Sequence, residues 1–71
     1  QSVMFGSAAA DHAVGEIQWP DHCLLVSIQR SGREIIPRGN TMIRAGDVLV
    51  TMTEEQYAGE VHDEVGEICE E

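Results

Sequence analysis

The chain has 71 residues, with 13 acidic against 4 basic side chains and a formal net charge of −9 at pH 7. A domain this small buries only about 60% of the surface that its unfolded chain exposes, so we expect one domain with a thin stability margin. Such chains usually gain stability from a disulfide, a metal or a partner, and dimerisation is therefore expected. The acidity disfavours nucleic acids and anionic membrane surfaces as partners.

The chain shows no sign of a membrane-spanning or secreted segment. It contains no run of 18 apolar residues, so direct membrane insertion is not expected. Because no secretory signal is visible, Cys23 and Cys69 are expected as reduced thiols in a cytosolic compartment. The start at Gln1, without an initiator methionine, is what a fragment of a longer protein would show.

The N-terminal part carries the weakest structural signals. Residues 1–10 are expected to be an extended or partly disordered lead-in, followed by one domain over residues 11–71. A short helix is predicted over residues 11–17, with Asp11 as its N-cap. Pro20 ends this helix, since the residue before a proline is pushed out of the helical region.

A β-hairpin is predicted next. Leu24, Val26 and Ile28 alternate with the residues between them, which indicates a strand with these three on one face. Ser31-Gly32 supplies a two-residue turn, because glycine tolerates the positive φ that such turns require. The returning strand ends at Pro37, whose missing N–H suits a strand end or edge.

Residues 38–46 are predicted to form a polar connection to a third strand. Thr41 is expected to cap a single helical turn that brings Met42 or Ile43 onto the core. The strand that follows carries its apolar side chains at alternate positions on one face. Those positions are Val48, Val50 and Met52.

The C-terminal segment has the features of an amphipathic helix with an acidic outer face. Thr53 and Gln56 match a capping box, in which the first residue caps the helix and the second reaches back. Apolar residues follow at helical spacing, at Tyr57, Val61, Val65 and Ile68. Glu70 and Glu71, which follow Cys69, are expected to fray, since negative charge is unfavourable at the C-terminal end of a helix.

The stretch over residues 22–52 resembles the TrkA-C domain, the C-terminal module of the family that regulates potassium conductance. The resemblance extends over about residues 11–53, and the Pro-Arg-Gly-Asn-Thr and Ala-Gly-Asp segments are its most specific parts. The matching positions are Ile28, Arg30, Gly32, Ile35, Ile36, Pro37, Gly39, Thr41, Ile43, Ala45, Gly46, Asp47 and Leu49. Residues 17–23 are similar to a subgroup that is appended to bacterial chloride channels of the ClC type.

This resemblance implies an α+β pseudo-barrel with the order strand, short helix, β-hairpin, strand and C-terminal helix. It implies no enzymatic activity and no cofactor, but a small regulatory ligand of unknown identity, such as a cyclic dinucleotide in some relatives, at a dimer interface. By matching position, the ligand contacts are Ile28, Arg30, Ile35, Ile36, Pro37 and Asn40. The positions with a structural role are Gly32, Gly39, Thr41, Gly46 and Asp47.

The function implied is regulation of an ion channel or transporter from the cytoplasmic side of the plasma membrane. The domain would form a homodimer and act on the transmembrane part of the same protein, with a ClC-type chloride channel as the first choice. One alternative is the C-terminal domain of a potassium or other cation transport protein. Another is a purely structural dimerisation module that binds no ligand.

Several other side chains permit two interpretations, an ordinary structural role and a functional one. Arg30 and Arg33 flank the turn and would grip an anion, or else are exposed charges paired with acids such as Glu34. For Gly46 and Asp47 a structural role is favoured, in which the carboxylate accepts backbone hydrogen bonds.

No metal site is predicted. The histidines and cysteines lack the spacing of zinc ligands. The acidic helix lacks the pattern of a calcium loop and is expected to be a solvated face. Its acidic side chains are Glu60, Asp63, Glu64 and Glu67. Trp19 is expected to pack over the pseudo-barrel or into the dimer interface.

Overall fold

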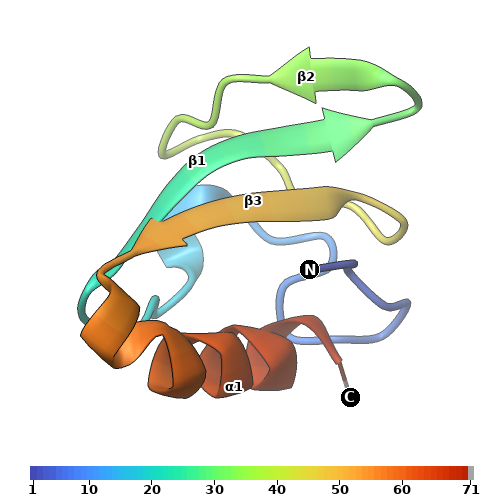
Figure 1. Ribbon diagram of the computed structural model, residues 1–71. Helices are drawn as coiled ribbons and strands as arrows, with labels where there is room; N and C mark the ends of the chain where they lie inside the picture. The colour runs from blue at the N-terminus through green and yellow to red at the C-terminus, as the bar shows by residue number, and fades with distance from the viewer. Residues whose placement is uncertain (71) are drawn as a thin grey trace.

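A three-stranded antiparallel sheet in the order β2-β1-β3 forms one layer of the fold, and α1 lies on one side of it (Figure 1). The computed structural model describes residues 1–70. The strands are β1 (Cys23–Arg30), β2 (Arg33–Ile35) and β3 (Val48–Thr53), and the helices are η1 (Val14–Glu16), η2 (Glu55–Tyr57) and α1 (Ala58–Cys69). Both η elements are single 3-10 turns. The predicted α+β class, with a hairpin, a further strand and a closing helix, is confirmed.

The hairpin between β1 and β2 forms where the sequence predicts it. Ser31 has φ 51° and Gly32 has φ 77°, so both turn residues are left-handed, as a type I′ turn requires. This turn matches the twist of the two strands and pairs Arg30 directly with Arg33. The strand β2 ends at Ile35, two residues before Pro37.

A β-bulge in β1 changes which residues face the core. The register of β1 against β3 shifts between Leu25 and Ser27, so an extra residue is inserted in β1. Ile28 is fully buried, whereas Leu24 and Val26 are 61% and 41% exposed. The prediction that these three residues share one face is therefore wrong, because the bulge reverses the alternation after Val26.

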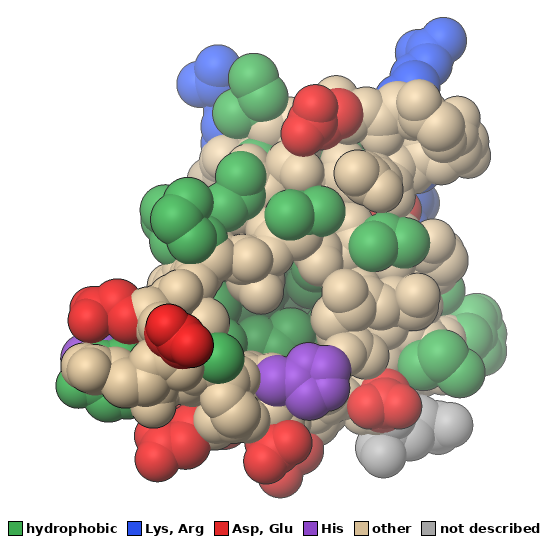
Figure 2. All heavy atoms as spheres, in the orientation of Figure 1, with side chains coloured by type: hydrophobic (Ala, Val, Ile, Leu, Met, Phe, Trp, Pro, Cys, Tyr) green, Lys and Arg blue, Asp and Glu red, His purple; other side chains and the backbone are tan. Residues whose placement is uncertain are grey.

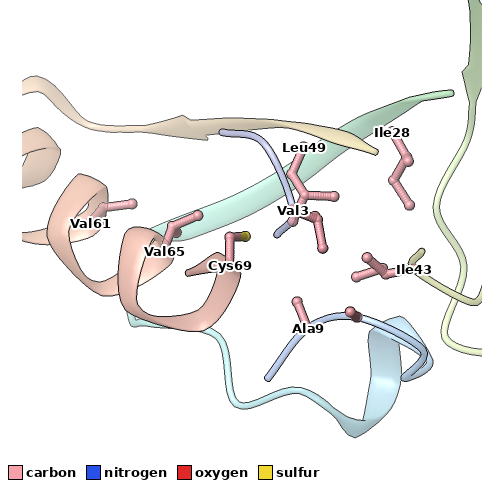
Figure 3. Close-up of a cluster of buried hydrophobic side chains, with 9 residues drawn as sticks. Val3, Ala9, Ile28, Ile43, Leu49, Val61, Val65 and Cys69 are labelled. Carbon is pink, nitrogen blue, oxygen red and sulfur yellow. The ribbon is translucent and has the colours of Figure 1, made fainter. Parts of the chain in front are cut away.

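The hydrophobic core lies between the sheet, α1 and the N-terminal segment (Figure 3). Its buried members are Val3, Ala9, Ala10, Ile28, Ile43, Leu49, Val61, Val65 and Cys69. From α1, Val61 and Val65 face the core with the spacing that the sequence predicts. Cys69, which precedes the end that is expected to fray, is fully buried. Of that end, Glu71 lies outside the described residues.

The N-terminal residues 1–10 contact both β3 and the end of α1. Ser2 forms an isolated antiparallel bridge with Val48. The amide of Met4 donates to the carbonyl of Cys69 at 2.7 Å, and the amide of Ala9 donates to that of Ile68 at 3.0 Å. These bonds satisfy carbonyl groups that a helix end leaves without a partner.

Three predictions about the extent or the capping of short helical segments are wrong. The helix over residues 11–17 is reduced to η1, and Asp11 has φ 63° and lies outside it. Thr41 caps no helical turn; its Oγ1 accepts a hydrogen bond from the amide of Arg38 at 2.9 Å. Thr53 forms no capping bond to α1, which begins after η2. In each case backbone contacts with other segments, which local sequence does not contain, decide the conformation.

Truncation of a buried and of an exposed isoleucine should change the free energy of unfolding by clearly different amounts. Ile43→Ala removes a side chain with 0% exposure and should lower the free energy of unfolding by about 2–5 kcal/mol. Ile36→Ala removes the same atoms from a residue with 75% exposure and should change it by about 0.5 kcal/mol or less. Urea unfolding followed by circular dichroism measures both. Equal effects in the two variants would contradict this assignment of the core.

Candidate functional site

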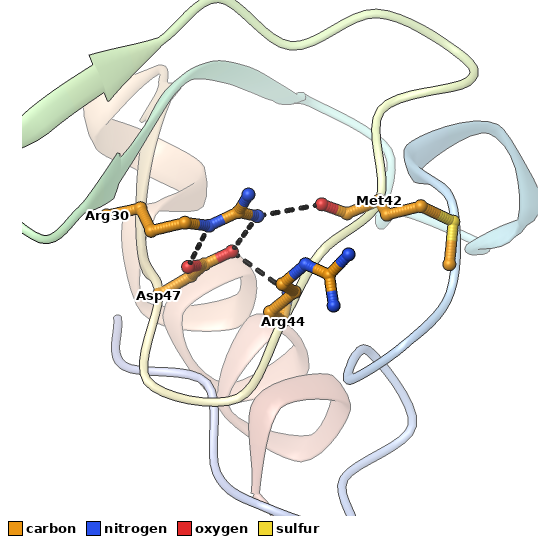
Figure 4. Close-up of polar contacts among 4 residues, drawn as sticks. All are labelled: Arg30, Met42, Arg44 and Asp47. Carbon is orange, nitrogen blue, oxygen red and sulfur yellow. Dashed lines mark hydrogen bonds and ion pairs between the residues drawn. The ribbon is translucent and has the colours of Figure 1, made fainter.

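The most elaborate polar contact joins the end of β1 to the turn before β3 (Figure 4). Arg30 Nε donates to Asp47 Oδ1 at 2.8 Å, and Arg30 Nη2 donates to Asp47 Oδ2 at 2.7 Å. Arg30 Nη2 also donates to the carbonyl of Met42 at 2.9 Å. Bidentate pairs of this kind are among the strongest polar contacts in proteins. This pairing therefore fixes the guanidinium of Arg30 in one orientation.

Asp47 connects three segments of the chain. Its Oδ2 accepts a hydrogen bond from the amide of Arg44 at 2.9 Å, and its carbonyl accepts one from the amide of Val3 at 2.8 Å. Burial by itself raises the pKa of Asp47, but the hydrogen bonds from Arg30 and the Arg44 amide, with the charges of both arginines, lower the pKa below its ordinary value. The hydrogen bond to Asp47 also raises the pKa of Arg30. The pair therefore stays charged at neutral pH.

The six predicted ligand contacts lie in two different environments. Ile28 is fully buried, Ile35 packs against the core, and Arg30 is engaged by Asp47. By contrast, Ile36 and Asn40 are exposed and Pro37 is half-buried, on the loop that follows β2. As ligand contacts all six stay predictions. Ile36 and Asn40 are open to solvent, and the side chain of Arg30 keeps 32% exposure beside Asp47.

The five predicted structural positions each have a particular backbone conformation or contact. Gly32 and Gly46 have positive φ, at 77° and 93°. The carbonyl of Gly39 accepts a hydrogen bond from the amide of Gly15 at 2.8 Å. Together with the contacts of Thr41 and Asp47, these features hold the connection between β2 and β3 against η1 and β1.

Sequence reasoning did not identify an exposed apolar patch on the sheet. Leu24 and Met52 are direct cross-strand partners, with exposures of 61% and 58%. Together with Val26 and Val50 they form what we call the outer face, which Figure 2 shows as hydrophobic side chains spread across the sheet. The bulge hides this patch in the sequence, because it reverses the alternation within β1. Exposed apolar patches often mark interaction sites.

The histidines and cysteines weighed as metal ligands are dispersed. The His22 ring stacks on Tyr57 with centroids 3.7 Å apart. Burial raises the pKa of the Cys69 thiol, and both cysteines are free. Within residues 1–70, no three His, Cys, Asp or Glu side chains lie close enough to hold a metal ion. Over the same range no helix has the length and apolarity to cross a bilayer.

Comparison with known proteins identifies the family. The family model of the TrkA-C domain matches residues 2–66. This chain belongs to the TrkA-C domain family. The predicted resemblance is thereby confirmed at the level of the domain, whereas the placement beside ClC-type chloride channels stays a prediction.

Two individual proteins are similar to this TrkA-C domain. It is 42% identical over 55 residues to the Trk system potassium uptake protein TrkA homolog of Archaeoglobus fulgidus. That match covers 75% of this chain and 13% of the relative. A solved structure described as an RCK domain with cda has a TM-score of 0.67 at 23% identity. The match covers 90% of this chain and 89% of the solved structure. It shows that the two proteins share a fold.

Removing the charge of Asp47 should destabilise the domain. In Asp47→Asn the Arg30 guanidinium loses its ionic partner, and we expect the free energy of unfolding to fall by about 1–3 kcal/mol. Asp63→Asn makes the same change on the exposed side of α1 and should alter it by about 0.5 kcal/mol or less. Urea unfolding at pH 7 compares the two. An Asp47→Asn variant as stable as Asp63→Asn would contradict the structural role of the pair.

The same carboxylate predicts a pH dependence. Because the folded pKa of Asp47 is lowered, its contribution is fully present above the unfolded pKa of about 3.9 and is lost as pH falls through the folded pKa. The difference in unfolding free energy between the native chain and Asp47→Asn should therefore be constant from pH 5 to pH 7. It should shrink below about pH 4, which unfolding curves recorded across this range would measure. A difference that grows on acidification would contradict the prediction.

Proposed function

We propose that this TrkA-C domain is a non-enzymatic regulatory module that forms a homodimer and controls an ion-transport protein. The observation that carries this proposal is the family match over residues 2–66, in a chain whose sheet has an exposed apolar outer face. The relative that is named for potassium uptake favours potassium as the transported ion. We place the module on the cytoplasmic side of the plasma membrane, linked to the membrane-spanning part of the system.

Self-association through the outer face follows from its composition. Leu24 and Met52 lie side by side and expose most of their side chains, so covering them removes apolar surface from water. Each Å² of apolar surface buried contributes about 25 cal/mol. Two identical copies related by a two-fold axis would cover the same patch on both partners. A second copy thus supplies the surplus stability that a chain of this size usually needs.

Regulation then requires a ligand that prefers one dimer geometry. Such a ligand shifts the equilibrium only through its different affinity for the two states. The predicted contacts Ile36, Pro37 and Asn40 lie on the exposed loop after β2, where a small molecule has access. A purely structural dimer is the rival proposal, and it predicts no stabilisation by any nucleotide or ion. Attachment to a ClC-type chloride channel is an alternative that rests on residues 17–23 alone.

The proposed interface can be tested with one charged substitution. Leu24→Glu places a charge on the outer face beside Met52 and should weaken dimerisation at least tenfold, since burying an unpaired carboxylate is costly. Phe5→Glu makes a similar change at a residue that is 84% exposed but lies in the N-terminal segment. Sedimentation equilibrium of both variants and the native chain measures the dissociation constants.

The native chain and Phe5→Glu should dimerise with equal affinity, and circular dichroism should show all three proteins folded. A native chain that stays monomeric at several hundred micromolar would contradict the proposal. Equal weakening in both variants would move the interface away from the outer face.

A further inference from the structure

We propose that a groove between the start of β1 and the end of β3 binds a small aromatic molecule that carries a positive charge. The groove lies at the opposite end of β1 from the hairpin turn (Figure 1). It shares no residue with the six predicted ligand contacts, so the inference goes beyond the proposed function and adds a separate site.

Two apolar side chains from neighbouring strands line the groove. Leu24 and Met52 are direct cross-strand partners, and both are more than half exposed. The groove has a volume of about 390 Å³, within the range of about 300–1,000 Å³ that is typical of small-molecule sites. The thioether of a methionine makes favourable contacts with aromatic rings. These features favour a ligand with a single aromatic ring. The lining residues are His22, Cys23, Leu24, Met52, Thr53 and Glu54.

The ring of His22 is held in place at this groove. His22 has φ 65°, in the left-handed region that residues other than glycine adopt only rarely. Such conformations persist only where the surrounding structure holds them, and they are frequent at ligand sites. The ring stacks on Tyr57 with centroids 3.7 Å apart and 5° between the ring planes. Because the ring is fixed before a ligand arrives, less conformational freedom is lost on binding.

The charges at this end of the molecule favour a cation. Within residues 1–70 no arginine forms an ion pair with Glu54. A second carboxylate acts nearby, since burial and then the charge of Glu64 raise the pKa of the Cys23 thiol. Arg30 lies at the far end of β1, about 23 Å from Cys23 along the strand, and charges are screened over about 8 Å. A positively charged ligand therefore meets attraction here and little repulsion.

Ligand binding at this groove and the proposed self-association use the same apolar surface. Leu24 and Met52 belong both to the groove and to the outer face. A ring seated on these two side chains would exclude a second copy that covers the outer face. The two events are therefore linked, and each weakens the other by the same factor. This consequence rests on the proposed homodimer, whereas the site itself does not.

The test uses three probes that separate the ring from the charge. Phenethylamine, whose amine is protonated at pH 7, carries both, phenylacetate carries the ring with a negative charge, and ethylamine carries the positive charge alone. Each is titrated into native protein below the dissociation constant of any dimer, with the chemical shift of the Leu24 amide as the readout. Phenethylamine should bind saturably and at least tenfold more tightly than either of the other two, because only it matches both the apolar wall and the carboxylate.

Matched variants locate the site. Met52→Ala removes the thioether and should weaken phenethylamine binding by about threefold to tenfold, whereas Met42→Ala, outside the groove, should stay within about twofold of native. Glu54→Gln should weaken it by about threefold to fivefold, which is the range of an exposed ion pair. Glu67→Gln removes an exposed carboxylate that does not line the groove and should again stay within about twofold. Circular dichroism checks that all variants are folded.

Each outcome decides the proposal. No saturable binding of phenethylamine by folded native protein overturns the site, and equal binding of phenylacetate overturns the assignment of a cation. A Glu67→Gln variant as weak as Glu54→Gln would show attraction by the net charge alone and also overturns it. Sedimentation of native protein separates the two proposals, since a dimer that binds no phenethylamine refutes the site and leaves the proposed function intact. A monomer that binds it supports the site and refutes the homodimer.

Discussion

A buried carboxylate has to keep a compensating charge, and in this TrkA-C domain Asp47 meets that requirement by holding Arg30 across the end of the sheet. Asp47 is 1% exposed, and its oxygens accept three hydrogen bonds from Arg30 and the Arg44 amide. Loss of one partner would leave an uncompensated buried charge, which is strongly unfavourable. The hairpin, the turn before β3 and the N-terminal segment are therefore held together at one point.

The parts of the fold that sequence predicts are those set by local chemistry. Ser31-Gly32 determines the hairpin because the turn needs two left-handed residues, and Val61 and Val65 determine the buried side of α1 by their spacing. The bulge beside Val26 was not predictable, since nothing in the alternation of β1 marks an inserted residue. The burial of Cys69 was not predictable, because it depends on residues 4–9, which pack against the end of α1 from the other end of the chain.

The residues of the candidate site also fall into those that local sequence predicts and those that only the fold brings together. Sequence identified Arg30 and Arg33 because both flank a recognisable turn, but it could not choose between an anion and an acidic side chain as their partner. Asp47 was assigned a structural role, although the long-range pairing with Arg30 is visible only in the fold. Arg44 was missed entirely, because a connection without regular structure brings it to the end of β1.

The hairpin carries different chemistry on its two sides. The outer face presents apolar side chains for a second copy, while the pair of Arg30 with Asp47 ties the other side to the turn before β3. In the regulatory mechanism we propose, a ligand on the loop after β2 would favour one arrangement of the two copies only by the difference in its affinity for the two arrangements.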